Sequence, residues 1–437
     1  MKAALLNKFG SPLEVGTLPD PVPGAGEIVV DVVAAGVLSY TGEVFSGARN
    51  YEMELPLVPG TAAIGRIRAT GPDSTRLKPG DWVACDITVR SRDDAQTPDI
   101  VLQGWSARGA GGRQLMRHFR HGAFAAQMMI PAENAIPLGP IDAADAGRWN
   151  ALNLLLVPYG GFVAVDLQPG ETVLVSGATG NYGSAGVAVA LAMGAARVVA
   201  PGRNEKVLDD LARRFGARVR TVRLTGDPEQ DQKRMQSAAG GPVDVVLDLL
   251  PPAAGPAPVR AAALTVREFG RVVLMGGVDA DLALPLRWLM RNSITVRGQW
   301  MFPRAAAPRL VSLVRAGLLD LKQYQVTEFS LDDVNQAVEH AAGDKPFMLT
   351  VVRPLSRYCG TGATLSPWPT PNRSVNPAIR PEVMASVTKA WRKARPAGWP
   401  GGQAKACRAV MKWPGRTSVP GSWLAAPASD EASPASR

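Results

Sequence analysis

The chain of 437 residues is long enough for two domains and a tail, and its hydrophobic fraction of 46% can form a sizeable core. Its net charge of +10 would suit a nucleic-acid partner, but that charge is unevenly distributed. From Pro354 onward there are 12 Lys or Arg against 3 Asp or Glu, which leaves about +1 for the preceding body, so we expect no nucleic-acid partner for that body.

The cysteine content and the hydropathy exclude further classes of protein. Three cysteines can form neither a disulfide framework nor a four-cysteine zinc site, and this usage indicates a reducing, cytoplasmic setting. Residues 1–8 contain no long apolar core, so we expect no signal peptide. The most apolar stretch, residues 151–167, is interrupted by a proline and two glycines and is too short to span a bilayer. We therefore expect no membrane partner.

The first 145 residues are predicted to be rich in β-strands. Residues 27–35 (EIVVDVVAA) form a strongly β-prone run that begins after three closely spaced prolines. Further short strands are expected at residues 63–70, 82–87 and 124–130, with glycine and proline in the turns between them. This pattern predicts a β-rich domain at the start of the chain.

Strands and helices begin to alternate after about residue 170. A strand at residues 171–176 is followed by a helix of small residues at 184–193 and a second strand at 197–200. The alternation continues with a helix and two buried strands, at residues 205–215, 243–249 and 271–275. Such spacing predicts βαβ units and a doubly wound parallel sheet, so the fold class is α/β.

The remaining sequence divides into a structured part and a tail. Helices are expected at residues 308–316 and 331–342, and a final strand at 347–352. Residues 354–437 contain 12 of the 37 prolines and 5 of the 10 tryptophans, and they show no sustained helical or strand period. We expect this basic, Pro- and Trp-rich tail to be disordered or loosely attached.

The turn between the first strand and helix of the parallel sheet carries the pattern GATGNYG at residues 177–183. Gly180 would let the backbone approach a pyrophosphate, Gly183 would let the helix pack closely on the strand, and the first helical amides would face the phosphates. We therefore predict a dinucleotide site formed by Ala178, Thr179, Gly180, Asn181, Tyr182 and Gly183. The alternative is a glycine-rich turn in a sheet protein that binds no nucleotide.

The end of the second strand of this unit indicates which dinucleotide would bind. A carboxylate there would bind the ribose hydroxyls of NAD, whereas a basic residue accommodates the 2′-phosphate of NADP. Residues 200–206 (APGRNEK) place no acidic residue at the strand tip, and Arg203 and Lys206 supply positive charge. The sequence thus favours NADP, the alternative being that both cations are solvated charges at a helix start.

Six short motifs precede the nucleotide turn. In chain order they are PGAGE (23–27), AAGV (34–37), VPG (58–60), PGDWV (79–83), GAFA (122–125) and PGETV (169–173). With these motifs, residues 1 to about 353 resemble the medium-chain dehydrogenase/reductase superfamily.

The resemblance implies a division of the chain into domains. Residues 1–145 would be the first part of a GroES-like catalytic domain, residues 146–285 a Rossmann NADP-binding domain, and residues 286–353 the completion of the catalytic domain. Residues 354–437 are left as the tail. By the same resemblance, the protein would be an oxidoreductase and a possible homodimer.

The residues at the superfamily's zinc positions differ from those of its zinc-dependent alcohol dehydrogenases. In those enzymes a cysteine, a histidine and a second cysteine or acid bind the catalytic zinc, and the matching positions here are Leu38, Thr61 and Asn153. None of these is a zinc ligand. The four-cysteine structural lobe is replaced by an Arg- and Gly-rich insertion at residues 86–121. The chain therefore resembles the zinc-free branch, which includes quinone oxidoreductases and enoyl reductases, and we expect no metal.

Two of the three histidines, His118 and His121, lie close together in this insertion. They could be imagined as a metal pair, but without cysteine or carboxylate partners such a site is incomplete. We interpret them as polar loop residues.

Tyrosines are the candidates for catalysis without a metal, because a phenol can donate a proton or stabilise an oxyanion. By resemblance Tyr40 follows the strand that opens the active cleft, and Tyr51 lies in a loop similar to one that carries a catalytic tyrosine in some enoyl reductases. Tyr159 would lie along the cofactor. Gly276 and Gly277 would let the backbone approach the nicotinamide. Each tyrosine could instead be an amphipathic residue at a domain boundary.

Trp300 and Phe302 lie in a segment that relatives place near the cofactor and the subunit interface. They could line a substrate pocket, or they could be ordinary core or dimer residues.

Three functions remain open from the sequence. The first is an NADPH-dependent reductase of quinones or α,β-unsaturated carbonyls, with a small-molecule substrate. The second is an alcohol dehydrogenase-like enzyme with a relocated or absent zinc. The third is a non-catalytic NADPH-binding protein whose basic tail, with tryptophans among its cations, binds nucleic acid or another acidic partner.

Overall fold

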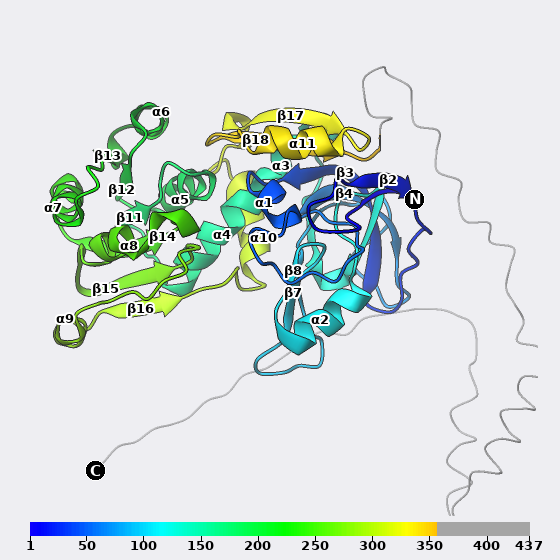
Figure 1. Ribbon diagram of the computed structural model, residues 1–437, viewed down its shortest axis with the longest axis horizontal. Coiled ribbons are helices and arrows are strands. Elements are labelled where there is room, and N and C mark those ends of the chain that lie inside the picture. Colours follow the sequence, from blue (N-terminus) through cyan, green and yellow to red (C-terminus); the bar gives the residue numbers. More distant parts are fainter. Residues whose placement is uncertain (356–437) are drawn as a thin grey trace, which may run out of the picture. The chain divides into compact units, whose positions relative to one another are not determined.

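A computed structural model describes residues 1–355, and the two sheets that dominate it are shown in Figure 1. The predicted parallel sheet has six strands in the order β13-β12-β11-β14-β15-β16, every neighbouring pair being parallel. Numbered along the chain this order is 3-2-1-4-5-6, the doubly wound arrangement of dinucleotide-binding domains. The strands are β11 (Thr172–Ser176), β12 (Arg197–Gly202), β13 (Val219–Arg223), β14 (Val243–Asp248), β15 (Val266–Leu274) and β16 (Thr295–Gly298).

Helices cover both faces of this sheet, because each central strand is apolar on both sides. Val173 and Val175 face one layer and Leu174 the other, as the alternation of a strand requires. The first layer contains α4 (Ala151–Ala164), α5 (Asn181–Ala192) and α6 (Glu205–Phe215), and the second α7 (Pro228–Ala239) and α8 (Pro256–Ala263). The short α9 (Leu286–Arg291) precedes β16.

The second sheet joins the two ends of the described chain. Its main path is β10-β5-β4-β3-β18-β17, and β9 also pairs with β3. Figure 1 shows β17 and β18 beside β3, and β18 pairs with β3 in antiparallel register, Val351 opposite Gly36. The strands are β3 (Glu27–Val37), β4 (Ala63–Thr70), β5 (Trp82–Cys85), β9 (Gln127–Pro131), β10 (Ala135–Pro137), β17 (Gln325–Ser330) and β18 (Met348–Arg353).

Shorter elements complete this sheet's surroundings. A two-stranded ribbon precedes β3, and a series of helices and single turns surrounds the sheet. They are β1 (Lys2–Leu5), β2 (Glu14–Thr17), α1 (Thr41–Phe45), η1 (Ala132–Asn134), η2 (Ala143–Asp145), α3 (Ala146–Trp149), α10 (Ala306–Arg315), η5 (Leu321–Gln323) and α11 (Val334–Ala341). Two further turns, η3 (Gly216–Arg218) and η4 (Pro252–Ala254), lie in the nucleotide-binding part.

The insertion at residues 86–121 forms a small lobe. Three short antiparallel strands, β6 (Thr88–Arg90), β7 (Ile100–Leu102) and β8 (Ser106–Ala107), are covered by α2 (Gly109–His118). Val89, Val101, Met116 and Phe119 give the lobe an apolar core of its own. Its arginines and glycines therefore surround a packed unit.

These observations confirm the predicted fold class, with a GroES-like sheet and a Rossmann-like parallel sheet, and they refine individual elements. The interrupted apolar stretch is helix α4, which accommodates Pro158 in its interior despite the lost backbone hydrogen bond. The sixth strand, β16, lies beyond residue 285, where the sequence placed the end of the nucleotide-binding domain, because the sheet takes one more parallel strand after α9. The division into domains otherwise remains a prediction, and the tail from residue 356 onward lies outside the described residues.

No helix within residues 1–355 is both long enough and apolar enough to cross a membrane.

Candidate functional site

The glycine turn has the geometry that a bound pyrophosphate requires. Gly177 takes a positive φ of 84° directly after β11, and α5 begins behind Gly180 with no acidic residue in its first turn. A Cβ on Gly183 would collide with the carbonyl oxygen of Gly177, so only glycine lets the helix start so close to the turn. The amides of the first helical turn are thereby left for an anion.

The two predicted 2′-phosphate cations lie beside this turn. A Cβ on Gly202, the last residue of β12, would collide with the side chain of Thr179, so the strand end and the turn are in contact. Arg203 and Lys206 follow and are exposed, and neither forms an ion pair with another described residue. The intervening Asn204 accepts a hydrogen bond from the amide of Val207 and caps α6. The cations are thus free to meet a ligand.

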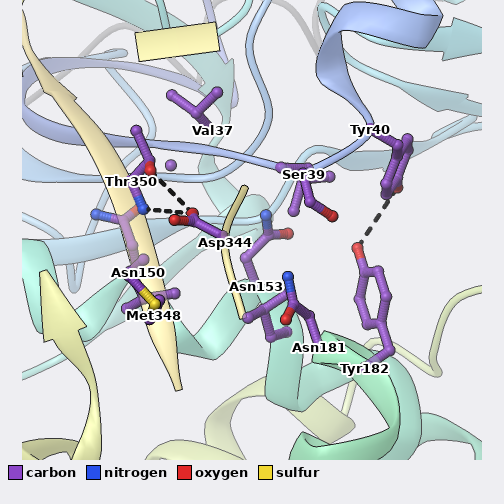
Figure 2. Close-up of a pocket in the computed structure, with 14 residues that line it drawn as sticks. Val37, Ser39, Tyr40, Asn150, Asn153, Asn181, Tyr182, Asp344, Met348 and Thr350 are labelled. Atoms are coloured by element: carbon purple, nitrogen blue, oxygen red, sulfur yellow. Dashed lines mark hydrogen bonds between the residues drawn. The ribbon is translucent and has the colours of Figure 1, made fainter. Parts of the chain in front are cut away.

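A pocket lies where the start of α5 meets the end of β3 and the last strand, β18 (Figure 2). Its lining comes from four parts of the chain: residues 36–40, 150–154, 181–182 and 344–350. Asn181 and Tyr182 of the glycine turn and the predicted catalytic residue Tyr40 are among them. The structure therefore brings the predicted dinucleotide turn and one predicted catalytic tyrosine to the same pocket.

Tyr40 and Tyr182 face each other on one side of this pocket, their hydroxyl oxygens 3.5 Å apart (Figure 2). Burial raises the pKa of Tyr182 to about 12, and burial together with the neighbouring phenols raises the pKa of Tyr40 well above its ordinary value. Both phenols therefore keep their protons at neutral pH, and either can donate a hydrogen bond.

An aromatic cluster holds Tyr40 in place. The buried Trp105 packs edge-on against the rings of Tyr40 (6.0 Å between centroids), Phe45 (5.9 Å) and Tyr51 (6.2 Å). The guanidinium of Arg49 also contacts Tyr40 and lies 4.4 Å from the centroid of its ring. Tyr51, the second predicted catalytic tyrosine, packs within this cluster, and its side chain does not line the pocket.

A second, more apolar pocket adjoins the first, because Asn150 and Asn153 line both. Met301 and Phe302 lie in its wall. Phe302 therefore lines a pocket, which was one of the two alternatives predicted for it. Most of its other wall is aliphatic, formed by Ala62, Ile64, Ala84, Ile87, Ile136, Leu152 and Leu156, with Trp149, Cys85 and Asp86. Burial raises the pKa of the Cys85 thiol to about 12, so this cysteine is an inert wall residue.

Comparison with known proteins agrees with this architecture. Residues 24–140 match the family described as alcohol dehydrogenase GroES-like domain, and residues 182–316 match zinc-binding dehydrogenase. The chain belongs to the medium-chain dehydrogenase/reductase superfamily. It is accordingly an oxidoreductase that depends on a nicotinamide dinucleotide.

Relatives in this superfamily cover nearly all of the described chain. An alcohol dehydrogenase from Moraxella sp. (strain TAE123) is 27% identical over 78% of this chain and 95% of its own length. A sorbitol dehydrogenase from Bacillus subtilis is 24% identical, covering 80% and 96% respectively. The structure of a thermostable alcohol dehydrogenase from Pyrobaculum aerophilum superposes with a TM-score of 0.62 at 26% identity, over 81% of this chain and 99% of that one.

The superfamily's zinc positions form a neutral cluster in this member. The Asn153 amide donates a hydrogen bond to Thr61 Oγ1 at 3.1 Å, and Thr61 donates to the carbonyl oxygen of Gly36 at 3.3 Å. Leu38 is buried beside them and lines the first pocket. No thiolate, imidazole or carboxylate is present at these positions, and within residues 1–355 no three His, Cys, Asp or Glu side chains gather as a metal site. These residues do not fit a catalytic zinc.

The two histidines of the insertion have separate structural contacts. His118 ends helix α2, so the expectation of a loop residue is wrong for it, and its Nε2 lies 2.5 Å from Oε1 of the buried Glu27, a carboxylate partner distant in sequence. His121 accepts a hydrogen bond from the amide of Val58 at 3.2 Å, and burial lowers its pKa. They do not share a ligand set.

The remaining predicted residues lie around the sheet's carboxyl edge and along α4. A Cβ on Gly276 would collide with the carboxylate of Asp248 at the end of β14, and Gly277 donates its amide to the carbonyl oxygen of Leu250. Tyr159 is buried in α4 and lines neither pocket. Trp300 is partly exposed under the guanidinium of Arg108, 4.9 Å from its ring centroid. The cofactor roles of Tyr159, Gly276 and Gly277 remain predictions.

Sequence reasoning missed several residues of this region, among them Trp105, Asp248 and the pocket residues Asp344 and Thr350. Trp105 follows Gly104, which has a positive φ of 68°, and a lone tryptophan after glycine in a polar insertion was an available signal. Asp248 ends a run of apolar residues in β14, and a carboxylate at the carboxyl end of a buried parallel strand was another.

Proposed function

We propose that this protein is an NADPH-dependent reductase that transfers hydride to a quinone or an α,β-unsaturated carbonyl without zinc. One observation carries the proposal: Thr61 and Asn153 are hydrogen-bonded to each other where zinc-dependent relatives bind the metal. A polarising Lewis acid is therefore replaced by neutral hydrogen-bonding groups.

The choice of NADPH rests on the free cations beside the glycine turn. Arg203 can form a paired hydrogen bond with a 2′-phosphate, and Lys206, in the first turn of α6, adds a second positive charge. When bound, the nicotinamide would supply the hydride. The turn residues 178–183 would hold its pyrophosphate, and the pocket beside them would receive the rest of the molecule.

Tyr40 supplies the polar group that a carbonyl or quinone acceptor needs. Its protonated phenol lines the pocket and can donate a hydrogen bond to an oxygen that gains negative charge during reduction. Tyr182 lies within reach of the Tyr40 hydroxyl and supports its orientation. Tyr51 stays a predicted catalytic residue, and its contact with Trp105 points to an indirect role in holding Tyr40.

The adjoining apolar pocket suits an acceptor that is itself largely apolar. Its wall is mostly aliphatic, and the amides of Asn150 and Asn153 are placed at the boundary with the first pocket. Burial of an apolar acceptor there would supply binding energy without a charged partner.

A second candidate is the oxidation of an alcohol, as the names of the relatives suggest. The curated relatives include alcohol, sorbitol and L-threonine 3-dehydrogenases. The proton-bearing Tyr40 could serve an alcohol and its ketone equally well, by microscopic reversibility. A non-catalytic dinucleotide-binding protein is the third candidate, and its basic tail lies outside the described residues.

One set of assays separates these functions. Purified protein is assayed with NADPH and NADH against quinones, 2-alkenals and 2-enoyl thioesters, and with NADP⁺ and NAD⁺ against primary and secondary alcohols. We expect turnover in the first set with at least about tenfold preference for NADPH, and zinc well below one atom per chain. Alcohol oxidation with stoichiometric zinc would overturn the proposal, and dinucleotide binding without any turnover would favour the third candidate.

A further inference from the structure

The buried carboxylate of Asp344 lines the first pocket, on the side opposite Tyr40 and Tyr182. Asp344 follows α11, and its side chain is 4% exposed. Its Oδ2 accepts hydrogen bonds from the amide and the hydroxyl of Thr350, at 3.0 and 2.8 Å, as Figure 2 shows. Its Oδ1 is buried and has no hydrogen-bond partner among the described residues. Oδ1 of Asp344 can therefore accept a further hydrogen bond.

The hydrogen bonds continue from Thr350 to the protein surface. The Thr350 hydroxyl has one hydrogen, and the bond to Asp344 uses it, so its contact with Nδ1 of His340 (2.9 Å) is one in which His340 donates. His340 packs against the ring of Phe329, and its side chain is 37% exposed. One directed chain, His340 to Thr350 to Asp344, therefore joins solvent to the pocket.

The electrostatic surroundings of Asp344 are simple. On the side of α11 its titratable neighbour is His340, whose Nδ1 lies 3.8 Å from Oδ1 of Asp344. Strand β18 contributes the neutral Thr350. Across the pocket stand the neutral phenols of Tyr40 and Tyr182. Burial raises the pKa of Asp344, partly offset by the bonds from Thr350 and by His340. The carboxyl group is therefore better able to hold a proton than an exposed aspartate.

We propose that His340, Thr350 and Asp344 form a proton conduit that supplies the proton consumed when the acceptor is reduced. The inference rests on the proposed function, because reduction of a carbonyl or quinone by NADPH takes up one hydride and at least one proton.

The transfer balances along the observed bonds. Asp344 gives its proton to the oxygen of the reduced acceptor, Thr350 passes its hydroxyl proton to Asp344 Oδ2, and His340 passes its Nδ1 proton to Thr350. As Nδ1 loses its proton, Nε2 of the same ring takes one from water, so the imidazole stays neutral and ends in its other tautomer. The net result is one proton moved from solvent to the pocket, while NADPH is oxidised and the acceptor is reduced.

If Asp344, Thr350 and His340 served only to hold the fold together, fewer of their hydrogen-bonding groups would be needed. Holding the end of α11 against β18 requires an acceptor for the Thr350 amide, which an asparagine would also supply. It requires neither the hydroxyl of Thr350 nor an exchangeable proton on His340. The two roles are therefore separable by substitution.

The kinetic test uses the intact enzyme in dilute, non-permeating buffer. His340→Ala is expected to lower kcat about tenfold with little change in the KM for NADPH, and added imidazole should restore most of the loss. Thr350→Val should lower kcat similarly, whereas Thr350→Ser, which keeps the hydroxyl, should not. His118→Ala, another partly exposed histidine outside the chain of bonds, is the matched control. An unchanged kcat for His340→Ala, or a loss that imidazole does not restore, would overturn the proposal.

A second measurement does not depend on turnover. With three histidines in the chain, their ring nitrogens can be followed by ¹⁵N NMR and assigned with the alanine variants. Thr350→Val should move the Nδ1 signal of His340, because the hydrogen-bond partner of that nitrogen is lost, and leave the signals of His118 and His121 unchanged. No movement would overturn the conduit even in active enzyme. The expected movement in a protein that reduces no acceptor would instead show that the proposed function, and not the coupling, has failed.

Discussion

The hydroxyl of Tyr182, in helix α5 directly after the glycine turn, lies 3.5 Å from the hydroxyl of Tyr40, which caps α1 142 residues earlier. The pair links the element that would hold the dinucleotide to the element that would face the acceptor. Neither phenol ionises near neutral pH, since burial raises both pKa values. Removal of one hydroxyl should therefore change the hydrogen bonding of the other.

Removal of the Tyr40 hydroxyl should slow reduction more than it weakens binding. We expect Tyr40→Phe to lower kcat at least about tenfold with a small change in the KM for NADPH, because the group acts on developing charge. Tyr182→Phe should have a smaller effect, and the double variant should be little worse than Tyr40→Phe alone, since the two act as a unit. Tyr324→Phe, at a buried tyrosine that packs on Phe347 and lines neither pocket, is the control. Equal, independent losses in Tyr40→Phe and Tyr182→Phe would contradict a coupled pair.

Arg203 should determine the preference between the two dinucleotides. Arg203→Ala is expected to weaken NADPH binding by about ten- to a hundredfold, the range for a lost charge-assisted hydrogen bond, and to leave NADH binding nearly unchanged. Titration by tryptophan fluorescence or calorimetry measures both affinities. Arg218→Ala, at an exposed arginine of η3, is the matched control for a general loss of positive charge. If the variant loses affinity for both dinucleotides equally, the 2′-phosphate contact is wrong.

The elements that could be predicted from the sequence are those with a strong local pattern. Residues 63–70 are a strand with the predicted bounds, and residues 205–215 are a helix with the predicted bounds. Helix α7 was missed, although Asp227 caps its start, Pro228 opens it and Gly240 ends it in the left-handed conformation. These capping residues are local signals as well, and they predict the helix despite its polar sequence.

The site itself was only partly accessible from the sequence, because its parts are far apart in the chain. The turn at 177–183 could be recognised since its chemistry lies in consecutive residues. The meeting of Thr61 with Asn153, and of Tyr40 with Tyr182, depends on packing between elements that no periodicity connects. Trp105 lies in a segment that looked like a polar insertion, and only the fold brings it beneath Tyr40.

The exposed edge of the nucleotide-binding sheet should pair with a second copy of the chain. Edge strand β16 has unpaired backbone groups on its outer side, with Val296 38% exposed, and in the preceding α9 Leu286 and Met290 are 79% and 67% exposed. Exposed apolar side chains beside an unpaired strand edge are uncommon in monomers, although this region also contains Arg287, Arg291 and Arg297. We expect a dimer by light scattering that Val296→Lys converts to monomer, whereas Leu318→Lys, at another exposed apolar site, does not. A wild-type monomer at micromolar concentration would exclude this pairing.

Asp248 should make the protein's stability fall as pH rises from about 4 to 6. Burial raises its pKa from 3.8 to about 6, an effect that the Ser176 side chain and the amides of Leu250 and Gly276 only partly offset. A carboxyl whose pKa is higher in the folded state stabilises that state fully below pH 3.8, and the contribution is lost as pH rises through the folded pKa.

The matching substitution is Asp248→Asn, which keeps the size of the side chain but cannot ionise. Relative to wild type, the free energy of unfolding of this variant should rise by on the order of 2–3 kcal/mol between pH 4 and pH 7, whatever its offset at pH 4. Urea unfolding of both proteins at the two pH values measures the change. Asp210→Asn, at a carboxyl whose pKa is lowered by hydrogen bonds from Arg214 and Arg213, should show no such pH-dependent gain. A difference between wild type and Asp248→Asn that is the same at both pH values would mean that Asp248 ionises in the folded protein as freely as in the unfolded chain.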